Sequence, residues 1–312
     1  MKLASFSTSD LPHARLGFVQ QDEIVDVDLA ARALDLQPYE HMQDLLDHYE
    51  PGMTVLQAIA HKAAGRRLRD VKTFSEVGAA YALSEVRLEA PIPRPRKNIM
   101  CLGRNYAEHA FESARTRGEK ETVPEAPIFF TKAPTTINGP FGKLVIDPHV
   151  STRIDWEVEL AVIIGRPGKN IRAGDALSHV FGYTVLNDVS ARDIQYLHKQ
   201  YFKGKSIDGY CPMGPWIVTA DEIPDPQNLR VRLRVNGVTK QEDTTANMLF
   251  DVRNIIVILS TGMTLEAGDI IATGTPSGVG DSRNPPEYLK AGDVMETEIE
   301  GIGTLRNTVE SL

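Results

Sequence analysis

Short runs in which hydrophobic and polar residues alternate dominate the first part of the chain, a pattern typical of β-strands. We therefore predict strands at 2–6, 15–19 and 23–27, and the helical periodicity that follows predicts helices at 42–48 and 55–64. Prolines at 91, 93 and 95 favour an extended linker. These patterns predict a small α+β domain at residues 1–90 and a second domain at 91–312.

The second domain is predicted to be mainly β. Its β-rich runs are separated by Gly, Pro and Asn turns and lie at 98–102, 128–131, 156–164, 180–186, 216–219, 230–235, 269–273 and 294–299. Helical periodicity is good only at 190–200 and 248–260, which disfavours a doubly wound parallel sheet. The charged segment 111–125 contains Gly118 and Pro124 and has the composition of a mobile flap.

Three carboxylates, Glu157, Glu159 and Asp188, interrupt or follow strongly apolar runs. A buried, unpaired carboxylate is costly, so cationic partners are expected nearby. In a strand, Glu157 and Glu159 would share one face about 7 Å apart. With Asp188 they could bind a hard cation such as Mg²⁺, Mn²⁺ or Ca²⁺, whereas zinc is disfavoured because no His or Cys stands at ligand spacing.

The spacing of these carboxylates also fits a second arrangement. Glu157 and Glu159 could lie on the solvent-exposed face of an edge strand, and Asp188 could cap a helix that begins near Ser190. The pattern alone favours neither arrangement.

Two further candidates are polar residues at suggestive positions. His109 and Glu112 would be neighbours on a helical turn, where a carboxylate can orient a His as general base, although a surface His–Glu pair has the same spacing. Lys205 follows Gly204, but the earlier glycine of a P-loop is missing because residue 199 is Lys. Lys205 is therefore either a fixed positive charge facing a substrate anion or a solvated lysine.

Composition narrows the classes of partner. The 312 residues carry 34 basic and 42 acidic side chains, which gives a formal charge of −8, and they contain no long basic run. This composition disfavours nucleic acid or an anionic membrane as the partner and favours a small molecule. No apolar stretch reaches the roughly 20 residues of a membrane span. We expect a cytoplasmic protein whose two cysteines, Cys101 and Cys211, lie in the core.

Seven motifs occur in one order between residues 92 and 312, at 103–109, 129–132, 155–164, 181–193, 204–206, 211–215 and 262–280. In this order they resemble the fumarylacetoacetate hydrolase family. The N-terminal domain resembles, less specifically, the variable domain of longer bacterial members, including oxaloacetate decarboxylases of this family.

The resemblance implies a fold, a metal site and a set of site residues. The fold is a mixed β-sandwich roll, and the implied cofactor is Mg²⁺ or Mn²⁺ bound by Glu157, Glu159 and Asp188. A catalytic His109–Glu112 dyad lies on a flap that orders when substrate binds, and Lys205 faces the substrate. The implied substrate contacts are Gln195 and Thr275, with Arg104 and Tyr106 as further candidates, and the implied assembly is a homodimer.

The implied substrate is a 2-oxo acid that reacts through a metal-bound enolate. Oxaloacetate decarboxylation and acylpyruvate C–C bond hydrolysis are the favoured outcomes, and the N-terminal resemblance favours the first. The alternatives are an isomerase or tautomerase of an unsaturated 2-oxo or 2-hydroxy dioate, and a 2-keto-3-deoxy sugar-acid dehydratase or hydrolase. A scaffold or regulatory protein with a vestigial site is the non-enzyme alternative.

Overall fold

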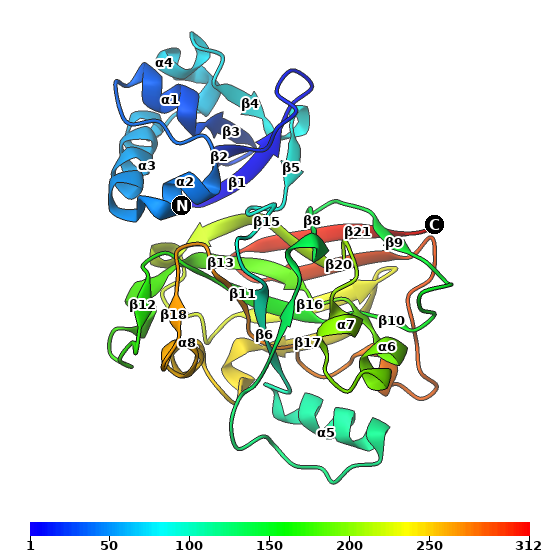
Figure 1. The fold of residues 1–312 in the computed structure, drawn as a ribbon. Helices are drawn as coiled ribbons and strands as arrows, with labels where there is room; N and C mark the ends of the chain where they lie inside the picture. Colours follow the sequence, from blue (N-terminus) through cyan, green and yellow to red (C-terminus); the bar gives the residue numbers. More distant parts are fainter.

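A mixed sheet of twelve strands runs through both parts of the chain in the computed structural model, which describes residues 1–312 (Figure 1). Its main path has the order β4-β3-β2-β1-β15-β13-β11-β19-β6-β7, with β5 beside β1 and β8 beside β15. The strands are β1 (Lys2–Ser7), β2 (Arg15–Gln20), β3 (Glu23–Asp26), β4 (Ala80–Ala82), β5 (Arg87–Glu89), β6 (Ile99–Gly103), β7 (Ile128–Lys132), β8 (Ile137–Asn138), β11 (Val158–Ile164), β13 (Val180–Asn187), β15 (Cys211–Thr219) and β19 (Ile270–Ala272).

A second sheet of five strands packs against the C-terminal part of the first, and two short strand pairs complete the β structure. The second sheet contains, in order, β17 (Val238–Thr244), β16 (Arg230–Val235), β20 (Val294–Ile299), β21 (Gly303–Ser311) and β9 (Leu144–Ile146). The short pairs are β10 (Ile154–Asp155) with β14 (Ser190–Ala191), and β12 (Gly168–Lys169) with β18 (Thr264–Leu265).

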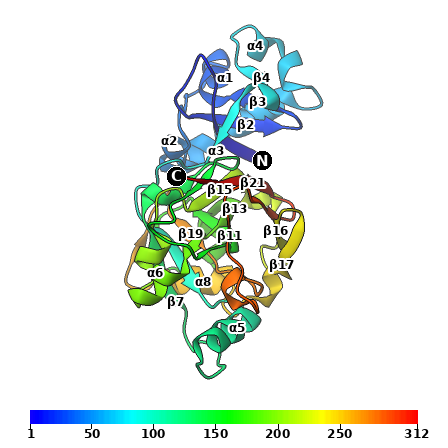
Figure 2. The same ribbon diagram turned by 90° about the vertical axis from the view of Figure 1, so that its right-hand side faces the viewer.

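The helices divide between the two lobes that Figures 1 and 2 show. Those of the N-terminal lobe are α1 (Val27–Ala33), α2 (Met42–Asp47), α3 (Tyr49–Ala63) and α4 (Lys72–Ser75). Those of the larger lobe are α5 (Ala107–Arg117), α6 (Arg192–Leu197), α7 (Phe202–Lys205) and α8 (Val252–Ser260). The α5 helix lies at the end of the molecule farthest from the N-terminal lobe (Figure 1).

The predicted mainly β class is confirmed, with differences at the ends of elements. The run predicted as one strand at 156–164 begins at Val158, because side chains of Asn187 and Gln241 accept the backbone N–H groups of Glu157 and Val158. The helix predicted at 190–200 is shorter, since residues 190 and 191 pair with β10. The α1 helix was not predicted; the Asp26 side chain caps it by accepting the N–H of Leu29.

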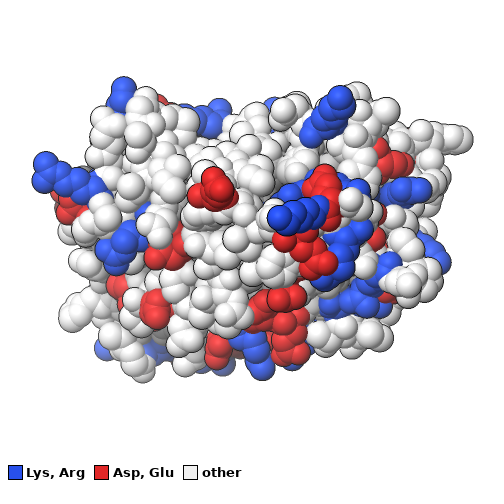
Figure 3. All heavy atoms as spheres, turned by 90° about the horizontal axis from the view of Figure 1, so that it is seen from below, with Lys and Arg blue, Asp and Glu red and all other residues white.

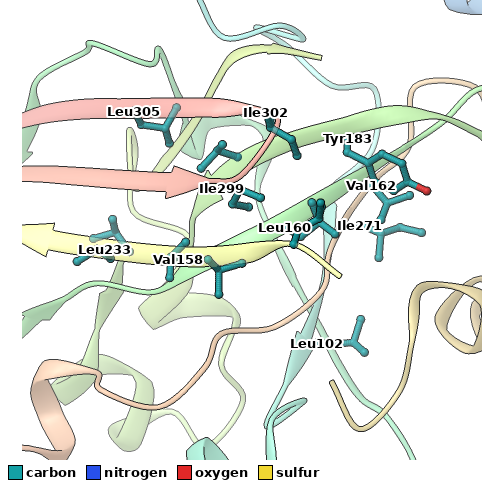
Figure 4. Close-up of a cluster of buried hydrophobic side chains, with 14 of the residues drawn as sticks. Leu102, Val158, Leu160, Val162, Tyr183, Leu233, Ile271, Ile299, Ile302 and Leu305 are labelled. Carbon is teal, nitrogen blue, oxygen red and sulfur yellow. The ribbon is translucent and has the colours of Figure 1, made fainter. Parts of the chain in front are cut away.

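The alternation of residues along β11 separates two hydrophobic cores. Val158, Leu160 and Val162 face the second sheet, where they pack with residues such as Leu233 and Leu305 (Figure 4). Ala161 and Ile163 point the other way, into a core shared with the N-terminal helices. Every residue of β11 is therefore buried, and Glu159 lies within this strand.

The N-terminal lobe is joined to the larger one by strand pairing. Lys2 and Leu3 of β1 pair with Val218 and Ile217 of β15, so one sheet crosses the expected domain boundary. The boundary near residue 90 stays a prediction. Because the two parts share one sheet and one hydrophobic core, we expect them to unfold together.

Gly182 on β13 marks a close approach of two backbones, and we expect Gly182→Ala to destabilise the protein. A Cβ atom there would lie 2.3 Å from the carbonyl oxygen of Val218 on the neighbouring strand, which cannot move aside cheaply. The expected loss is about 1–3 kcal/mol in the free energy of unfolding, measured by denaturant titration. Gly174→Ala, where the added methyl meets open space, is the matched control and should change stability by less than about 0.5 kcal/mol. Equal effects at both positions would contradict this reading of the packing.

Surface charge is mixed on the face that carries α5. Figure 3 shows basic and acidic side chains interspersed there, without a continuous basic surface. None of the helices combines the length and the apolar character needed to cross a bilayer.

Candidate metal centre and active site

Glu157, Glu159 and Asp188 form one buried cluster. Each can offer a carboxylate oxygen such that the three atoms lie within 4.8 Å of one another, and the residues are 4%, 1% and 0% exposed. The arrangement follows from strand pairing: β11 and β13 pair as far as Val158 and Asn187, so the next residues outward, Glu157 and Asp188, remain neighbours. The backbone N–H of Asp188 donates to the carbonyl of Glu157 at 2.9 Å.

The alternative in which the two glutamates face solvent on an edge strand is wrong. The β11 strand lies between β13 and β19, and both glutamates are buried. Asp188 caps no helix, because residues 190 and 191 form β14 and α6 begins only at Arg192.

Two buried lysines compensate part of the negative charge. Lys132 donates to Asp188 (Nζ–Oδ1 2.7 Å), and Lys205 lies between Glu157 (Nζ–Oε2 2.7 Å) and Asp188 (Nζ–Oδ2 2.8 Å). Burial disfavours the charged form of Lys205, but Asp188 and Glu157 outweigh it and raise the pKa of the ammonium group above its ordinary value. Lys205 therefore stays protonated and is a fixed positive charge, one of the two alternatives that its sequence context allowed.

Glu159 lacks such a partner. Its Oε2 accepts the N–H of Gly274 at 2.8 Å, while its buried Oε1 has no hydrogen-bond partner. Burial, and then the charges of Asp188 and Glu157, raise the pKa of Glu159 well above its ordinary value. An all-oxygen cluster with one uncompensated carboxylate fits a hard divalent cation, as predicted for Mg²⁺ or Mn²⁺.

Arg192, at the start of α6, links the cluster to Asp155. Its Nε donates to Asp155 Oδ2 at 2.8 Å, and its Nη2 lies 2.7 Å from Glu157 Oε1. Burial of Glu157 opposes ionisation, but Lys205 and Arg192 outweigh it and lower the pKa of Glu157 to about 2. Asp155 is no part of the three-carboxylate cluster; it also accepts the N–H groups of Gly280 and Asp281 and so ties Arg192 to the loop after β19.

The His109–Glu112 pair is present on α5. His109 Nδ1 and Glu112 Oε1 are 2.9 Å apart, and Glu112 also accepts the N–H of Gly278 at 3.0 and 3.1 Å. Because Nδ1 bonds to a carboxylate, Nε2 is the ring nitrogen available to exchange a proton. Both side chains are largely buried, so the pair is not the surface ion pair that has the same spacing.

The segment expected to be a flap is partly helical. The α5 helix includes its first half and ends where Gly118 adopts a left-handed conformation, at φ 66°. In this structure α5 is held against the loop after β19 by the Glu112–Gly278 bond and by Thr116, whose hydroxyl oxygen lies 3.2 Å from that of Ser282. The helix therefore covers the site, with His109 facing inward.

One small cavity brings most of the predicted residues together. Arg104, His109, Glu157, Gln195, Lys205 and Thr275 all contribute to its walls. Glu112, Glu159 and Asp188 do not line it, but Glu112 bonds to His109 and Asp188 accepts from Lys205. Tyr106 does not line it either: it is 2% exposed and belongs to the hydrophobic core, so its position does not support the predicted substrate contact. The reason is that Tyr106 immediately precedes α5 and bridges to Met248, which turns it away from the cavity.

Three basic residues of this region were not predicted as site residues. Lys132 ends an apolar strand and Arg192 lies within the motif at 181–193, while Arg117 is on the last turn of α5 and lines the cavity. Lys132 could have been predicted from the sequence, because it is a charged residue at the end of an apolar run, the same feature that identified the three carboxylates. Arg117 could not have been predicted in this way, since the segment around it is charged throughout.

A mainly β fold in which a buried carboxylate cluster, a buried lysine and a His–Glu pair reach one cavity through Glu157, Lys205 and His109 defines a metal-dependent enzyme. The model of the fumarylacetoacetate (FAA) hydrolase C-terminal family matches residues 98–310. The chain therefore belongs to the fumarylacetoacetate hydrolase family, as its motifs predicted, and is an enzyme of that family.

Comparisons with individual proteins agree with this assignment. The chain is 49% identical over 239 residues to oxaloacetate tautomerase YisK of Bacillus subtilis (strain 168), covering 76% of this chain and 78% of that protein. It is 40% identical over 316 residues to the mitochondrial oxaloacetate tautomerase fahd2 of Xenopus laevis, covering 99% and 90%. Among solved structures, maleylpyruvate hydrolase from Sphingobium sp. SYK-6 in complex with manganese(II) and pyruvate is similar with a TM-score of 0.74 and 29% identity, covering 100% and 99%.

Proposed function

We propose that this enzyme interconverts the keto and enol forms of oxaloacetate, with Mg²⁺ or Mn²⁺ bound by Glu157, Glu159 and Asp188. The observation that carries the proposal is that His109 of the His109–Glu112 pair and Glu157 of the carboxylate cluster line one cavity together with the protonated Lys205. The 49% identity to an oxaloacetate tautomerase supports the choice of substrate. This outcome is the tautomerase alternative of the sequence prediction.

The reaction needs a proton moved between carbon and oxygen. A bound divalent cation would polarise the keto oxygen of the substrate and stabilise the negative charge that develops on it. Lys205, buried and positively charged, adds to that stabilisation without having to reorganise. Glu112 holds the His109 ring so that Nε2 can exchange a proton with C3 of the substrate.

The proton balance is closed. In the direction from enol to keto, the hydroxyl on C2 releases its proton to solvent, the double bond moves from C2–C3 to C2–O, and protonated His109 gives its Nε2 proton to C3. A proton from solvent then returns to His109, so the protein is unchanged after each turnover. The reverse direction removes that proton from C3 and returns one to the oxygen. No bond between carbons breaks, and no water is consumed.

Oxaloacetate decarboxylation and acylpyruvate hydrolysis remain candidate activities of the same cavity. Both would leave pyruvate as one product, and the structurally similar maleylpyruvate hydrolase was solved with pyruvate. Hydrolysis would further require His109 and Glu112 to activate a water molecule. Because tautomerisation, decarboxylation and hydrolysis would all take place in this cavity, they must be distinguished by their products rather than by the loss of substrate.

The test follows the enol and the products in parallel. With enol oxaloacetate and Mn²⁺- or Mg²⁺-loaded protein, we expect the ultraviolet absorbance of the enol to decay faster than with the metal ion alone. Pyruvate, measured with lactate dehydrogenase in the same mixture, should form far more slowly than the enol disappears. Pyruvate release at the rate of substrate loss would instead identify a decarboxylase, and the absence of any acceleration would exclude the proposal.

The cytoplasmic location and the homodimer expected from the sequence stay predictions. Size-exclusion chromatography with light scattering would determine the assembly directly.

A further inference from the structure

We propose that Arg104 and Arg117 bind the second carboxylate of a dicarboxylate substrate, and that Glu119 of the chain itself occupies this position until substrate displaces it. This inference rests on the proposed function, because oxaloacetate carries a second carboxylate at C4. It names the residues that would distinguish oxaloacetate from 2-oxo acids with one carboxylate.

The two arginines converge on Glu119. Arg104 Nη2 donates to Glu119 Oε2 at 2.9 Å, and Arg117 Nε lies 3.8 Å from Glu119 Oε1. Both arginines line the cavity that contains His109 and Lys205. Arg104 Nε is buried and has no hydrogen-bond partner, so its guanidinium has a donor to spare for a further acceptor.

Charge balance singles out this pair among the cations of the site. Lys132, Lys205 and Arg192 are each within ion-pair distance of carboxylates of the metal centre or of Asp155. Arg104 and Arg117, in contrast, have Glu119 as their only carboxylate partner. A substrate whose first carboxylate lies at the metal centre would bring its second toward these two arginines, where Glu119 is the carboxylate that it would replace.

Arg104 is held in place, whereas Glu119 is positioned to move. Arg104 has a left-handed backbone, at φ 55°, and precedes Asn105, whose side chain bonds to the backbone of Phe250 and Thr273. A non-glycine residue in this conformation persists only where its surroundings fix it. Glu119 lies just beyond Gly118, outside regular structure, and its side chain is 49% exposed.

A neighbouring ion pair provides a matched control. Glu121 pairs with Arg115 (Oε2–Nη1 2.7 Å), and its side chain is 46% exposed, close to the value for Glu119. Neither Glu121 nor Arg115 lines the cavity. If the affinity for ligand changed only because the segment lost a charge or became less stable, Glu121→Gln should therefore change it as much as Glu119→Gln does.

The experiment measures binding without turnover. Mn²⁺-loaded protein is titrated calorimetrically with 3,3-difluorooxaloacetate, which has no proton at C3, and with its 4-methyl ester, which lacks the second charge. For the wild type we expect the dicarboxylate to bind at least about tenfold more tightly than the ester, as a hydrogen-bonded charge pair implies. Arg117→Gln should weaken the dicarboxylate about 10- to 100-fold and the ester less than about threefold.

The variant that decides the role of Glu119 is Glu119→Gln. It should tighten binding of the dicarboxylate about two- to fivefold, the range for releasing a half-exposed ion pair, and leave the ester unchanged. Glu121→Gln should change neither. The inference is overturned if Glu119→Gln leaves the dicarboxylate unchanged, weakens it, or shifts both ligands equally. Because binding is read without catalysis, a protein that shows these shifts but does not tautomerise oxaloacetate would contradict the proposed function alone.

Discussion

Replacing Glu159 by Gln is expected to weaken Mn²⁺ binding about 10²- to 10³-fold and to abolish measurable turnover, because one of three anionic ligands is lost. The same change should leave the metal-free protein as stable as the wild type or more stable. The raised pKa of Glu159 means that ionising this carboxyl costs folding free energy at neutral pH, and Gln removes that cost. Gln also keeps an oxygen to accept the N–H of Gly274.

Asp188→Asn provides the contrast that makes this prediction specific. It should also abolish metal binding, but Asp188 pairs with both Lys132 and Lys205, so its loss leaves two buried ammonium groups short of a partner. We expect the metal-free Asn variant to lose about 3–5 kcal/mol in the free energy of unfolding. Metal affinity is measured by calorimetry and stability by denaturant titration in chelator. A stability loss in Glu159→Gln as large as that in Asp188→Asn would contradict the assignment of Glu159 as the uncompensated carboxylate.

His109→Gln is expected to lower kcat for enol decay about 10²- to 10⁴-fold, the range for losing a positioned general acid or base. Metal affinity should stay within about threefold of the wild type, because His109 bonds to Glu112 rather than to the carboxylate cluster. Steady-state kinetics at saturating Mn²⁺, with a parallel metal titration, measures both quantities.

Glu108→Gln is the matched control for His109→Gln, since Glu108 precedes it on α5 and its side chain is exposed. We expect this variant to keep wild-type kcat. If His109→Gln kept more than about a tenth of the activity, proton transfer would have to be assigned to another group or to a water molecule in the cavity.

The sequence by itself determined the three candidate carboxylates and the larger elements of the fold, although the pattern alone did not decide between a buried cluster and an exposed edge strand. Glu157, Glu159 and Asp188 could be found because each charge interrupts or follows an apolar run, and such a position requires compensation wherever the strand lies. His109 and Glu112 could be paired because three residues make nearly one helical turn. The strand periodicity of 2 likewise predicted most of the sheet, because alternation depends only on one strand having two faces.

Only the tertiary structure decided which groups stand opposite one another. Lys132 reaches Asp188 across 56 positions of sequence, β1 pairs with β15 across more than 200, and Tyr106 turns into the core rather than the cavity. The junction between Arg104, Arg117 and Glu119 likewise depends on how α5 and the loop before it are held. A periodic pattern reports which face of an element is apolar, but the partner across that face is set by strand register and packing, which are properties of the whole chain.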